Sequence, residues 1–224
     1  MVNTFLVHSD FRKSASLLDN RRLVKQRCEA QQILNILLFA KGLATYYNIR
    51  MPSITASRNV KRRFFSLMYQ LSLKQPSITD FHKYKSCLEK LVTNTNNRFI
   101  LRNDVIVHIK NIKTYNVQKD ELIVKLGFCQ HPVILMWYGY EDALKEYIEA
   151  HIEEHIKRGY KNNMKRYPNI IGIHPTWTKD ENFHKNHMAA LLNKELTRNE
   201  KSWYQVKLEF SSAGRFTKYV WPNN

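Results

Sequence analysis

Apolar positions recur at helical spacing over residues 1–42 and predict two helices. Ser9 can cap a short helix that runs to about Leu18. Asp19 can cap a longer helix that ends at about Lys41, before Gly42. Because the amino-terminal part of the longer helix is polar and charged, we expect its carboxyl-terminal part to be the buried one. Its apolar stripe consists of Leu23, Ala30, Leu34, Leu37 and Leu38.

The pattern changes over residues 43–127. Two segments with helical periodicity, about 57–73 and 79–93, are followed by two β-rich segments, 105–109 and 122–126. We interpret this region as an inserted α+β element. Within it, the cations Lys61-Arg62-Arg63 precede Phe64 and Phe65, which fits either an extended DNA-binding surface or a solvated helix face over buried aromatic rings.

The region 128–224 returns to helical periodicity. A helix that starts at Pro132 should run to about Arg158 and end at Gly159, because proline suits a first helical turn and glycine the residue after the last. A final helix is predicted from Phe183 to about Glu195. The chain is therefore expected to be mainly α, with one helical core formed by residues 1–42 and 128–224.

The chain carries 36 Lys and Arg against 19 Asp and Glu, a formal net charge of +17. Residues 1–75 hold 13 of the cations and 3 of the acids. This imbalance favours a polyanionic partner whose affinity falls with salt, although a merely basic soluble surface is the simpler alternative.

Other features narrow the class of protein. No apolar run approaches the ~20 residues that span a bilayer, and no signal peptide is evident. Three widely spaced cysteines fit a reducing compartment. We therefore expect an intracellular, DNA-associated protein that is not secreted, with the nucleus, a viral factory or a virion as possible locations. No phosphate-binding or nucleophile-elbow motif is present, which disfavours a phosphate-loop NTPase and an elbow hydrolase. We expect no cofactor.

A lone carboxylate stands out in the longer amino-terminal helix. Glu29 follows four nearby cations. It shares a helix face with Gln26, three residues earlier, and with Arg22, four residues before Gln26. A carboxylate among cations suggests chemistry on DNA in addition to binding. Its alternative role is an ion pair with Arg22 or Lys25.

Histidine pairs and aromatic residues offer further candidates. His151 and His155 match an H-x-x-E-H zinc pattern, so a zinc hydrolase is a third hypothesis, but packed histidines are commoner and we expect no metal. The pair His184 and His187 fits phosphate or base contact better than metal. Trp203-Tyr204 offers flat rings on which bases could stack, unless these rings belong to the core.

Several motifs together resemble the pyrimidine-dimer DNA glycosylase/endonuclease V family. The resemblance covers residues 1–42 and 128–224. The amino-terminal motifs are Asn3-Thr-Phe-Leu, Ser9-Asp10-Phe11 and Leu18-Asp19-x-x-Arg22-Leu23-x-Lys25-Gln26-Arg27-x-Glu29-Ala30-x-Gln32-Ile33-Leu34. The later motifs are His131-Pro132-x-x-x-Met136-Trp137, Gly139-Tyr140-Glu141-Asp142-Ala143-Leu144, Phe183-His184-x-x-His187 and Tyr219-Val220-Trp221-Pro222.

The resemblance implies a metal-free enzyme that binds damaged duplex DNA, flips a nucleotide and attacks it through the terminal amine. The amine would belong to Val2 if Met1 is removed, and to Met1 otherwise. An α-amine has a pKa of about 7.7–8.0, so an appreciable fraction is neutral and nucleophilic near pH 7. The family's catalytic Glu follows an Arg, and Arg22 stands at the matching position here. Glu29 is the substitute candidate, with Asp10 second.

The resemblance also implies a set of DNA contacts. The expected DNA-binding residues are Arg21, Arg22, Lys25, Arg27, His131, Trp137, His184, His187 and Lys194. Met188 and Asn193 replace cations that cellular relatives carry. This loss leaves open an alternative function, that of a non-catalytic basic DNA-binding or genome-packaging protein. The lesion and the oligomeric state are not fixed by the sequence.

Overall fold

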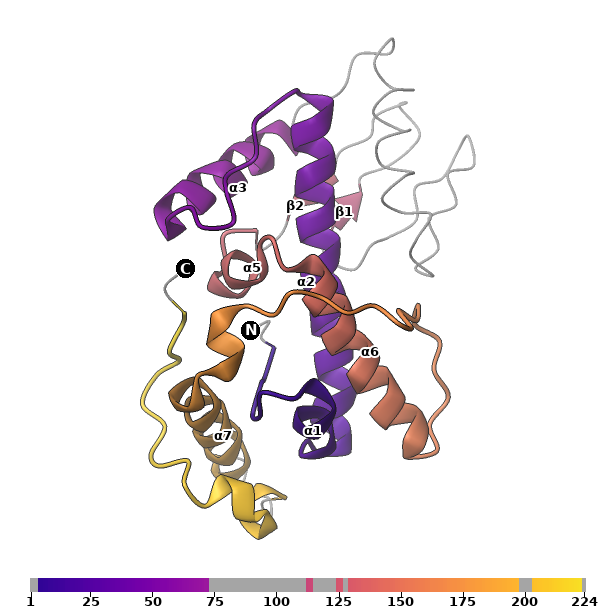
Figure 1. The fold of residues 1–224 in the computed structure, drawn as a ribbon, viewed down its shortest axis with the longest axis vertical. Coiled ribbons are helices and arrows are strands. Elements are labelled where there is room, and N and C mark those ends of the chain that lie inside the picture. The colour runs from indigo at the N-terminus through magenta and orange to yellow at the C-terminus, as the bar shows by residue number, and fades with distance from the viewer. Residues whose placement is uncertain (1–3, 73–111, 115–123, 127–128, 198–202, 223–224) are drawn as a thin grey trace. The chain divides into compact units, whose positions relative to one another are not determined.

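The computed structural model describes residues 4–72, 112–114, 124–126, 129–197 and 203–222, with side chains except at 112–114 and 124–126. The described part is mainly α, as predicted (Figure 1). Its α-helices are α1 (Phe11–Ser16), α2 (Asn20–Tyr46), α3 (Arg58–Ser72), α5 (Pro132–Trp137), α6 (Glu141–Lys157) and α7 (Glu181–Leu196). Its short 3-10 helices are η2 (Thr176–Lys179), η3 (Tyr204–Val206) and η4 (Leu208–Phe210).

The chain divides into two compact units. The first comprises residues 1–31, 140–162 and 166–223, and the second comprises residues 32–139, 163–165 and 224. Helix α2 starts in the first unit and ends in the second. The division of the chain into residues 1–42 with 128–224 and an insertion at 43–127 stays a prediction.

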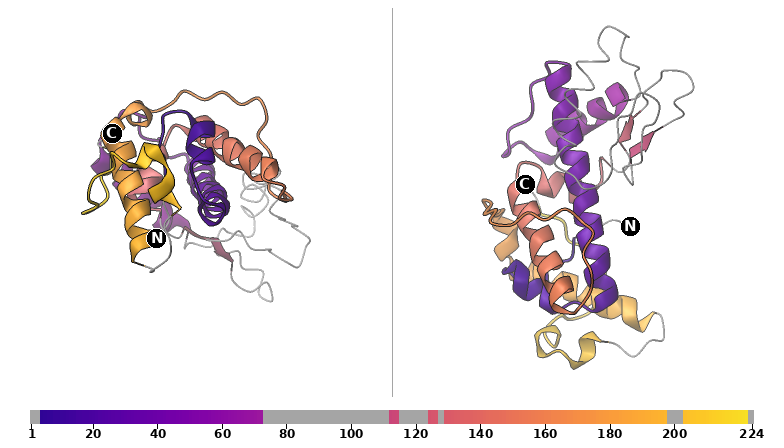
Figure 2. Two further views of the ribbon diagram at one scale, coloured as in Figure 1. Left: turned by 90° about the horizontal axis from the view of Figure 1, so that it is seen from below. Right: turned by 90° about the vertical axis from the view of Figure 1, so that its right-hand side faces the viewer.

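The first unit is built around α1, the first turns of α2, α6 and α7. Helix α1 packs against α6 (Figure 2). At this contact the rings of Phe11 and Tyr147 meet edge to face with 5.4 Å between their centroids. An apolar cluster joins the chain start, α1 and α7 to the carboxyl-terminal segment. Its members include Phe5, Val7, Leu18, Leu23, Leu191, Tyr204 and Phe210.

The second unit contains α3, α5 and a small antiparallel sheet. Strands β1 (Ile112–Thr114) and β2 (Val124–Leu126) pair with Lys113 opposite Lys125. Helix α3 packs against α5 and β2. The second predicted strand overlaps β2, whereas the predicted helix at 79–93 and strand at 105–109 lie outside the described residues.

The predicted start of the first helix and the predicted end of the second were wrong. Helix α1 is capped by Asp10, whose carboxylate accepts the backbone N–H of Lys13 at 2.8 Å, and not by Ser9. Helix α2 continues through Gly42 to Tyr46, because the burial of the following Leu43 and Ala44 outweighs the roughly 1 kcal/mol that glycine costs a helix.

The helix expected from Pro132 to Arg158 is two helices. They are separated at Gly139, whose φ of +88° favours glycine and where an added Cβ would meet the Ile54 side chain at 2.5 Å. Gly159, with a φ of +84°, ends α6 as predicted. Asp19 also caps α2 as predicted, because its carboxylate accepts the Arg22 N–H at 2.9 Å. None of the described helices has the length and apolarity needed to cross a bilayer.

Candidate functional site

The first described residues form a buried extended segment that side chains hold in place. Thr4, Phe5, Leu6 and Val7 are almost fully buried. The Phe5 N–H donates to Gln26 Oε1 at 2.6 Å and the Leu6 N–H to His187 Nδ1 at 2.9 Å. The Val7 N–H donates to Ser14 Oγ at 3.0 Å. Side chains from α2, α7 and α1 thus replace the partners that a sheet would supply.

Glu29 belongs to the same buried network. Gln26 Nε2 donates to Glu29 Oε2 at 3.2 Å, while Gln26 Oε1 accepts the Phe5 N–H. Lys25 Nζ lies 3.5 Å from Glu29 Oε1, and Glu29 as a whole is 7% exposed. The carboxylate is therefore one side chain away from the backbone of the chain start, and it is paired with a half-exposed cation.

Tyr147 of α6 completes this network. Its hydroxyl lies 2.9 Å from the Phe5 carbonyl and 3.1 Å from Gln26 Oε1. Burial first, and the negative charge of Glu29 second, hold the pKa of Tyr147 well above its usual value. The phenol therefore stays protonated and donates. Tyr147 was not among the residues predicted for the site, and the available signal was a hydroxyl at helical spacing from Leu144 and His151.

The four cations predicted on α2 differ in exposure. Arg21 and Lys25 reach solvent, whereas Arg22 and Arg27 are buried. Arg27 Nη1 donates to Asn162 Oδ1 at 3.0 Å, and burial lowers the pKa of Arg27. Arg22 is 3% exposed, and neither its Nε nor its Nη2 has a hydrogen-bond partner in the part of the chain that the structure describes.

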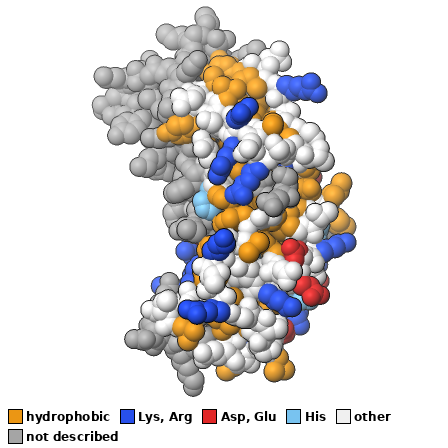
Figure 3. Space-filling view, turned by 90° about the vertical axis from the view of Figure 1, so that its left-hand side faces the viewer, with side chains coloured by type: hydrophobic (Ala, Val, Ile, Leu, Met, Phe, Trp, Pro, Cys, Tyr) orange, Lys and Arg blue, Asp and Glu red, His pale blue; other side chains and the backbone are white. Residues whose placement is uncertain are grey.

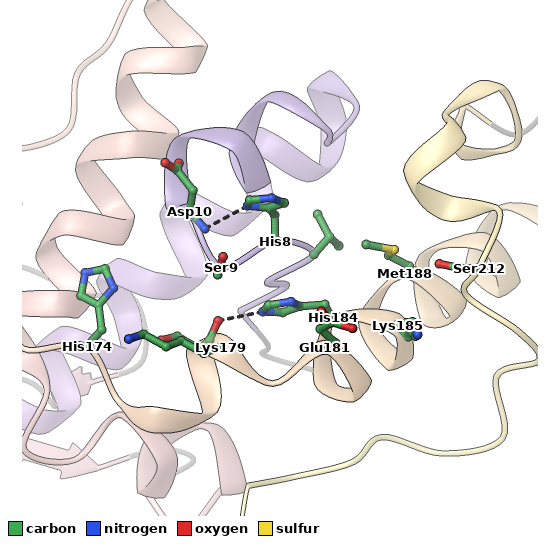
Figure 4. Close-up of a pocket in the computed structure, with 12 residues that line it drawn as sticks. His8, Ser9, Asp10, His174, Lys179, Glu181, His184, Lys185, Met188 and Ser212 are labelled. Carbon is green, nitrogen blue, oxygen red and sulfur yellow. Dashed lines mark hydrogen bonds between the residues drawn. The ribbon is translucent and has the colours of Figure 1, made fainter.

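A pocket of about 690 Å³ opens beside the chain start (Figure 4). One wall is Val7 to Asp10, and the others come from His174, η2, α7 and Ser212. His184 Nε2 lies 2.9 Å from the Thr178 carbonyl, and burial lowers the pKa of His184. The lining carries two cations, Lys179 and Lys185, and two carboxylates, Asp10 and Glu181, so it offers both hydrogen-bond donors and acceptors to a polar ligand. The volume lies within the usual range of ligand pockets.

The remaining predicted DNA contacts occupy varied positions. Lys194 lies over the Phe5 ring with Nζ 4.4 Å from the centroid, next to the buried segment. His131 is half-buried and caps α5, where its ring accepts the Val133 N–H at 3.3 Å. Trp137 and His187 are fully buried, so neither presents a surface to a ligand in this conformation. Val2 and Met1 lie outside the described residues.

Asp10, the alternative acid, and His151, of the predicted zinc pair, both make contacts within the fold. The Asp10 carboxylate caps α1. His151 is fully buried, and its Nδ1 lies 2.8 Å from the Tyr147 carbonyl. Over the described ranges, no cluster of three or more His, Cys, Asp or Glu side chains is arranged to hold a metal ion.

Charge is unevenly distributed over the surface. On the face drawn in Figure 3, Lys and Arg side chains are spread widely, whereas Asp and Glu side chains gather in one small area. This distribution fits a polyanionic partner.

A family model described as pyrimidine dimer DNA glycosylase matches residues 2–168. The matched range includes the whole Glu29 network except His187, and it ends before α7. Comparison with curated proteins and with solved structures gave no match.

Proposed function

The chain belongs to the pyrimidine dimer DNA glycosylase family, and from this premise we propose that it is a bifunctional repair enzyme that also nicks the strand. Its substrate is damaged duplex DNA that carries a pyrimidine dimer or an abasic site. The nucleophile is the terminal amine of Val2, or of Met1 where Met1 is retained. The observation that supports this assignment best is the buried network that joins the chain start to Glu29.

Covalent geometry supports the choice of the terminal amine. Successive α-carbons are 3.8 Å apart, so the α-carbon of Val2 cannot lie more than about 7.6 Å from that of Thr4. The next residue, Phe5, is fixed by Gln26 on its N–H and by Tyr147 on its carbonyl. The terminal amine therefore belongs to a residue only three or four positions before a point of the chain that is fixed beside Gln26. Effective tethering of a nucleophile beside a proton acceptor is a large part of catalysis.

The reaction proceeds in two balanced steps. The neutral amine forms a bond to C1′ while the bond from C1′ to the base breaks, and the departing base takes the electron pair and a proton. The C1′–O4′ bond then breaks, O4′ takes the remaining proton of the amine nitrogen, and an imine is left between C1′ and that nitrogen. Glu29 removes a proton from C2′, the C3′–O bond breaks, and the 3′ phosphate leaves with its electron pair. Positioned proton transfer of this kind contributes about 10²–10⁴ in rate.

The pocket beside the chain start is proposed to receive the extruded nucleotide. Its volume of about 690 Å³ is suitable for a nucleotide, and Lys179 and Lys185 can meet a phosphate. Val7, which lines it, is two residues from the Phe5 backbone. Filling it by Ser212→Trp is expected to raise KM more than it lowers kcat on a lesion duplex, whereas equal effects would place the nucleotide elsewhere.

Borohydride trapping tests the mechanism directly. Untagged protein is mixed with duplexes that contain a pyrimidine dimer or an abasic site, and the adduct is mapped by peptide mass. An adduct at the terminal residue is expected, and a short extension at the amino terminus should abolish it while leaving binding intact. Absence of any adduct, with a free terminus and intact binding, would leave the non-catalytic DNA-binding alternative as the better account.

The role of Glu29 has a matched control. Glu29→Gln keeps the size and hydrogen bonding of the side chain but removes its base, so single-turnover strand cleavage should fall about 10²–10⁴-fold with little change in binding. Glu153→Gln removes an exposed carboxylate that pairs with Arg12 at 2.9 Å, and it should leave cleavage unchanged. Equal rates in the two variants would assign Glu29 a structural role.

A further inference from the structure

The segment that contains η3 and η4 presents large apolar side chains to solvent. Trp203 is 45% exposed, Val206 77% and Leu208 86%. Trp203 and Val206 are three residues apart, the spacing that aligns side chains along a 3-10 helix. The segment follows the family match at residues 2–168, so the match assigns it no role.

These side chains stand on a firmly anchored base. Tyr204 is fully buried and its hydroxyl donates a short hydrogen bond to Asp19, the cap of α2. The Tyr204 and Phe210 rings are stacked with 4.8 Å between their centroids. Lys13 Nζ lies 3.3 Å from Glu209 Oε1. An exposed apolar group on a fixed base loses little conformational entropy when it binds, which suits insertion into a partner.

The surroundings of this apolar group are cationic. Lys207 Nζ lies 5.0 Å from the centroid of the Trp203 ring. Arg21 and Arg22 lie two and three residues after Asp19, and the positive charge of Arg22 acts on Tyr204. The acid of the segment, Glu209, is paired with Lys13. Cations around an apolar tip match DNA, in which phosphates flank the base stack.

A second exposed apolar pair provides the contrast. Ile171 is 90% exposed and Ile173 86%. Between them, Gly172 packs so closely on α6 that an added Cβ would meet the Ala143 nitrogen at 2.1 Å, and its N–H donates to Glu146 Oε2 at 3.2 Å. This pair is similarly exposed, but the charged group beside it is the Glu146 carboxylate, whereas Lys207 lies over the Trp203 ring.

We propose that Trp203, Val206 and Leu208 form an apolar wedge that enters the base stack of duplex DNA at the lesion. This inference rests on the proposed function, which supplies damaged DNA as the partner. The wedge fills the gap that an extruded nucleotide leaves, and the cations of α2 and Lys207 hold the phosphates on either side. Ser212 of the same carboxyl-terminal region lines the pocket proposed for that nucleotide, so one region serves both tasks.

The test separates insertion from chemistry. The probe is a duplex with a tetrahydrofuran abasic analogue, which cannot form an imine, and with 2-aminopurine opposite the analogue to report unstacking. Trp203→Ala and the double variant Val206→Ser with Leu208→Ser are compared with Ile171→Ser with Ile173→Ser as the control. Full-length protein is used, and circular dichroism and thermal melting verify that each variant is folded.

We expect Trp203→Ala to weaken binding to the analogue duplex roughly 5- to 100-fold, the range typical of one lost base stack. The 2-aminopurine signal should fall with it, affinity for an undamaged duplex should change less, and the isoleucine control should behave as wild type. Unchanged affinity and signal in both wedge variants would overturn the proposal, as would equal losses in the isoleucine control. A changed oligomeric state with unchanged DNA affinity would instead assign the surface to self-association. Absence of a borohydride adduct in wild type, with these signals intact, would refute the lyase reaction alone.

Discussion

Two arginines of the first unit, Arg158 and Arg22, differ in how the hydrogen-bond donors of their guanidinium groups are satisfied. Every nitrogen of the Arg158 guanidinium has a partner. Nε donates to Glu154 at 2.8 Å, and the other two nitrogens donate to the carbonyls of Ala15, Ser16 and Leu18 and to Asn20 Oδ1. Arg22 is more deeply buried, yet its Nε and Nη2 have no partner in the described ranges.

This difference in hydrogen bonding suggests a different role for each arginine. Arg158 ties the end of α6 to the turn between α1 and α2, and its hydrogen bonds offset its desolvation. Nε and Nη2 of Arg22 have lost water without such compensation in the described ranges, which is unfavourable. We propose that this arginine is held for a phosphate of bound DNA. The partners of a buried charge, more than its burial, thus distinguish structure from function.

The largest effect should follow from breaking the satisfied arginine. Arg158→Met leaves the Glu154 carboxylate and three carbonyls without their donor, so the free energy of unfolding should fall by on the order of 3 kcal/mol. Urea denaturation measures it. Lys157→Met, at an exposed neighbour in α6, is the control and should change stability little. A similar loss in both variants would contradict the role assigned to the Arg158 contacts.

Two buried histidines of the first unit, His187 and His151, should make the stability of the fold depend on pH. Burial depresses the pKa of His187 to about 3 and that of His151 to about 4, below the unfolded value near 6.5. Between these values the unfolded chain binds protons that the folded chain does not. Stability is therefore fully present above pH 6.5 and falls by about 1.4 kcal/mol per pH unit for each histidine as the pH drops toward 4.

The variant His187→Asn, which can still accept the Leu6 N–H, should remove one such contribution from the slope. Denaturant titrations at pH 4.5, 5.5 and 6.5 measure the slope for wild type and variant. His8→Asn, at a histidine that is partly exposed, is the control. A slope that the His187 substitution leaves unchanged would mean that another group dominates.

A smaller effect on affinity should follow from removing the unsatisfied arginine. Arg22→Met relieves a desolvated charge, so stability should stay level or rise, while affinity for duplex DNA falls about tenfold. The slope of log affinity against log salt should fall by about 0.9, the value for one lost phosphate contact. Fluorescence anisotropy between 50 and 200 mM salt gives both quantities. Loss of stability without loss of affinity would make Arg22 a structural residue like Arg158.

The smallest effect should come from an exposed pair. Arg12 and Glu153 are 2.9 Å apart, but the Arg12 side chain is 75% exposed. Removing the pair by Arg12→Ala should cost about 0.2–1 kcal/mol, and salt should erase the difference. Thermal melting at low and high salt measures it. A cost near that of Arg158→Met would show that the number of ion-pair atoms matters more than their burial.

Periodicity predicted most of the helical core, and tertiary packing decided the rest. The stripe from Leu23 to Leu38 identified α2, but its length was missed because the burial of Leu43 and Ala44 lies outside any local pattern. The break at Gly139 depends on Ile54, which is 85 positions away.

Part of the candidate site was also predictable from the sequence, and part was not. The shared face of Gln26 and Glu29 was evident from their spacing, and the structure joins these side chains at 3.2 Å. The contrast between Arg22 and Arg158 was not evident, because all partners of Arg158 except Glu154 lie 138 to 143 positions earlier in the chain. Local sequence carries no information about such distant acceptors.

The hydrogen bond from Leu6 to His187 spans 181 positions of the chain and has a consequence for synthesis. Residue 6 leaves the ribosome early, whereas its partner appears only when α7 has been made. The segment that carries the proposed nucleophile therefore cannot settle until nearly the whole domain has been translated, since long-range contacts form late. Incomplete chains released from a stalled ribosome would lack this contact, so the proposed strand-nicking activity is expected only of the complete domain.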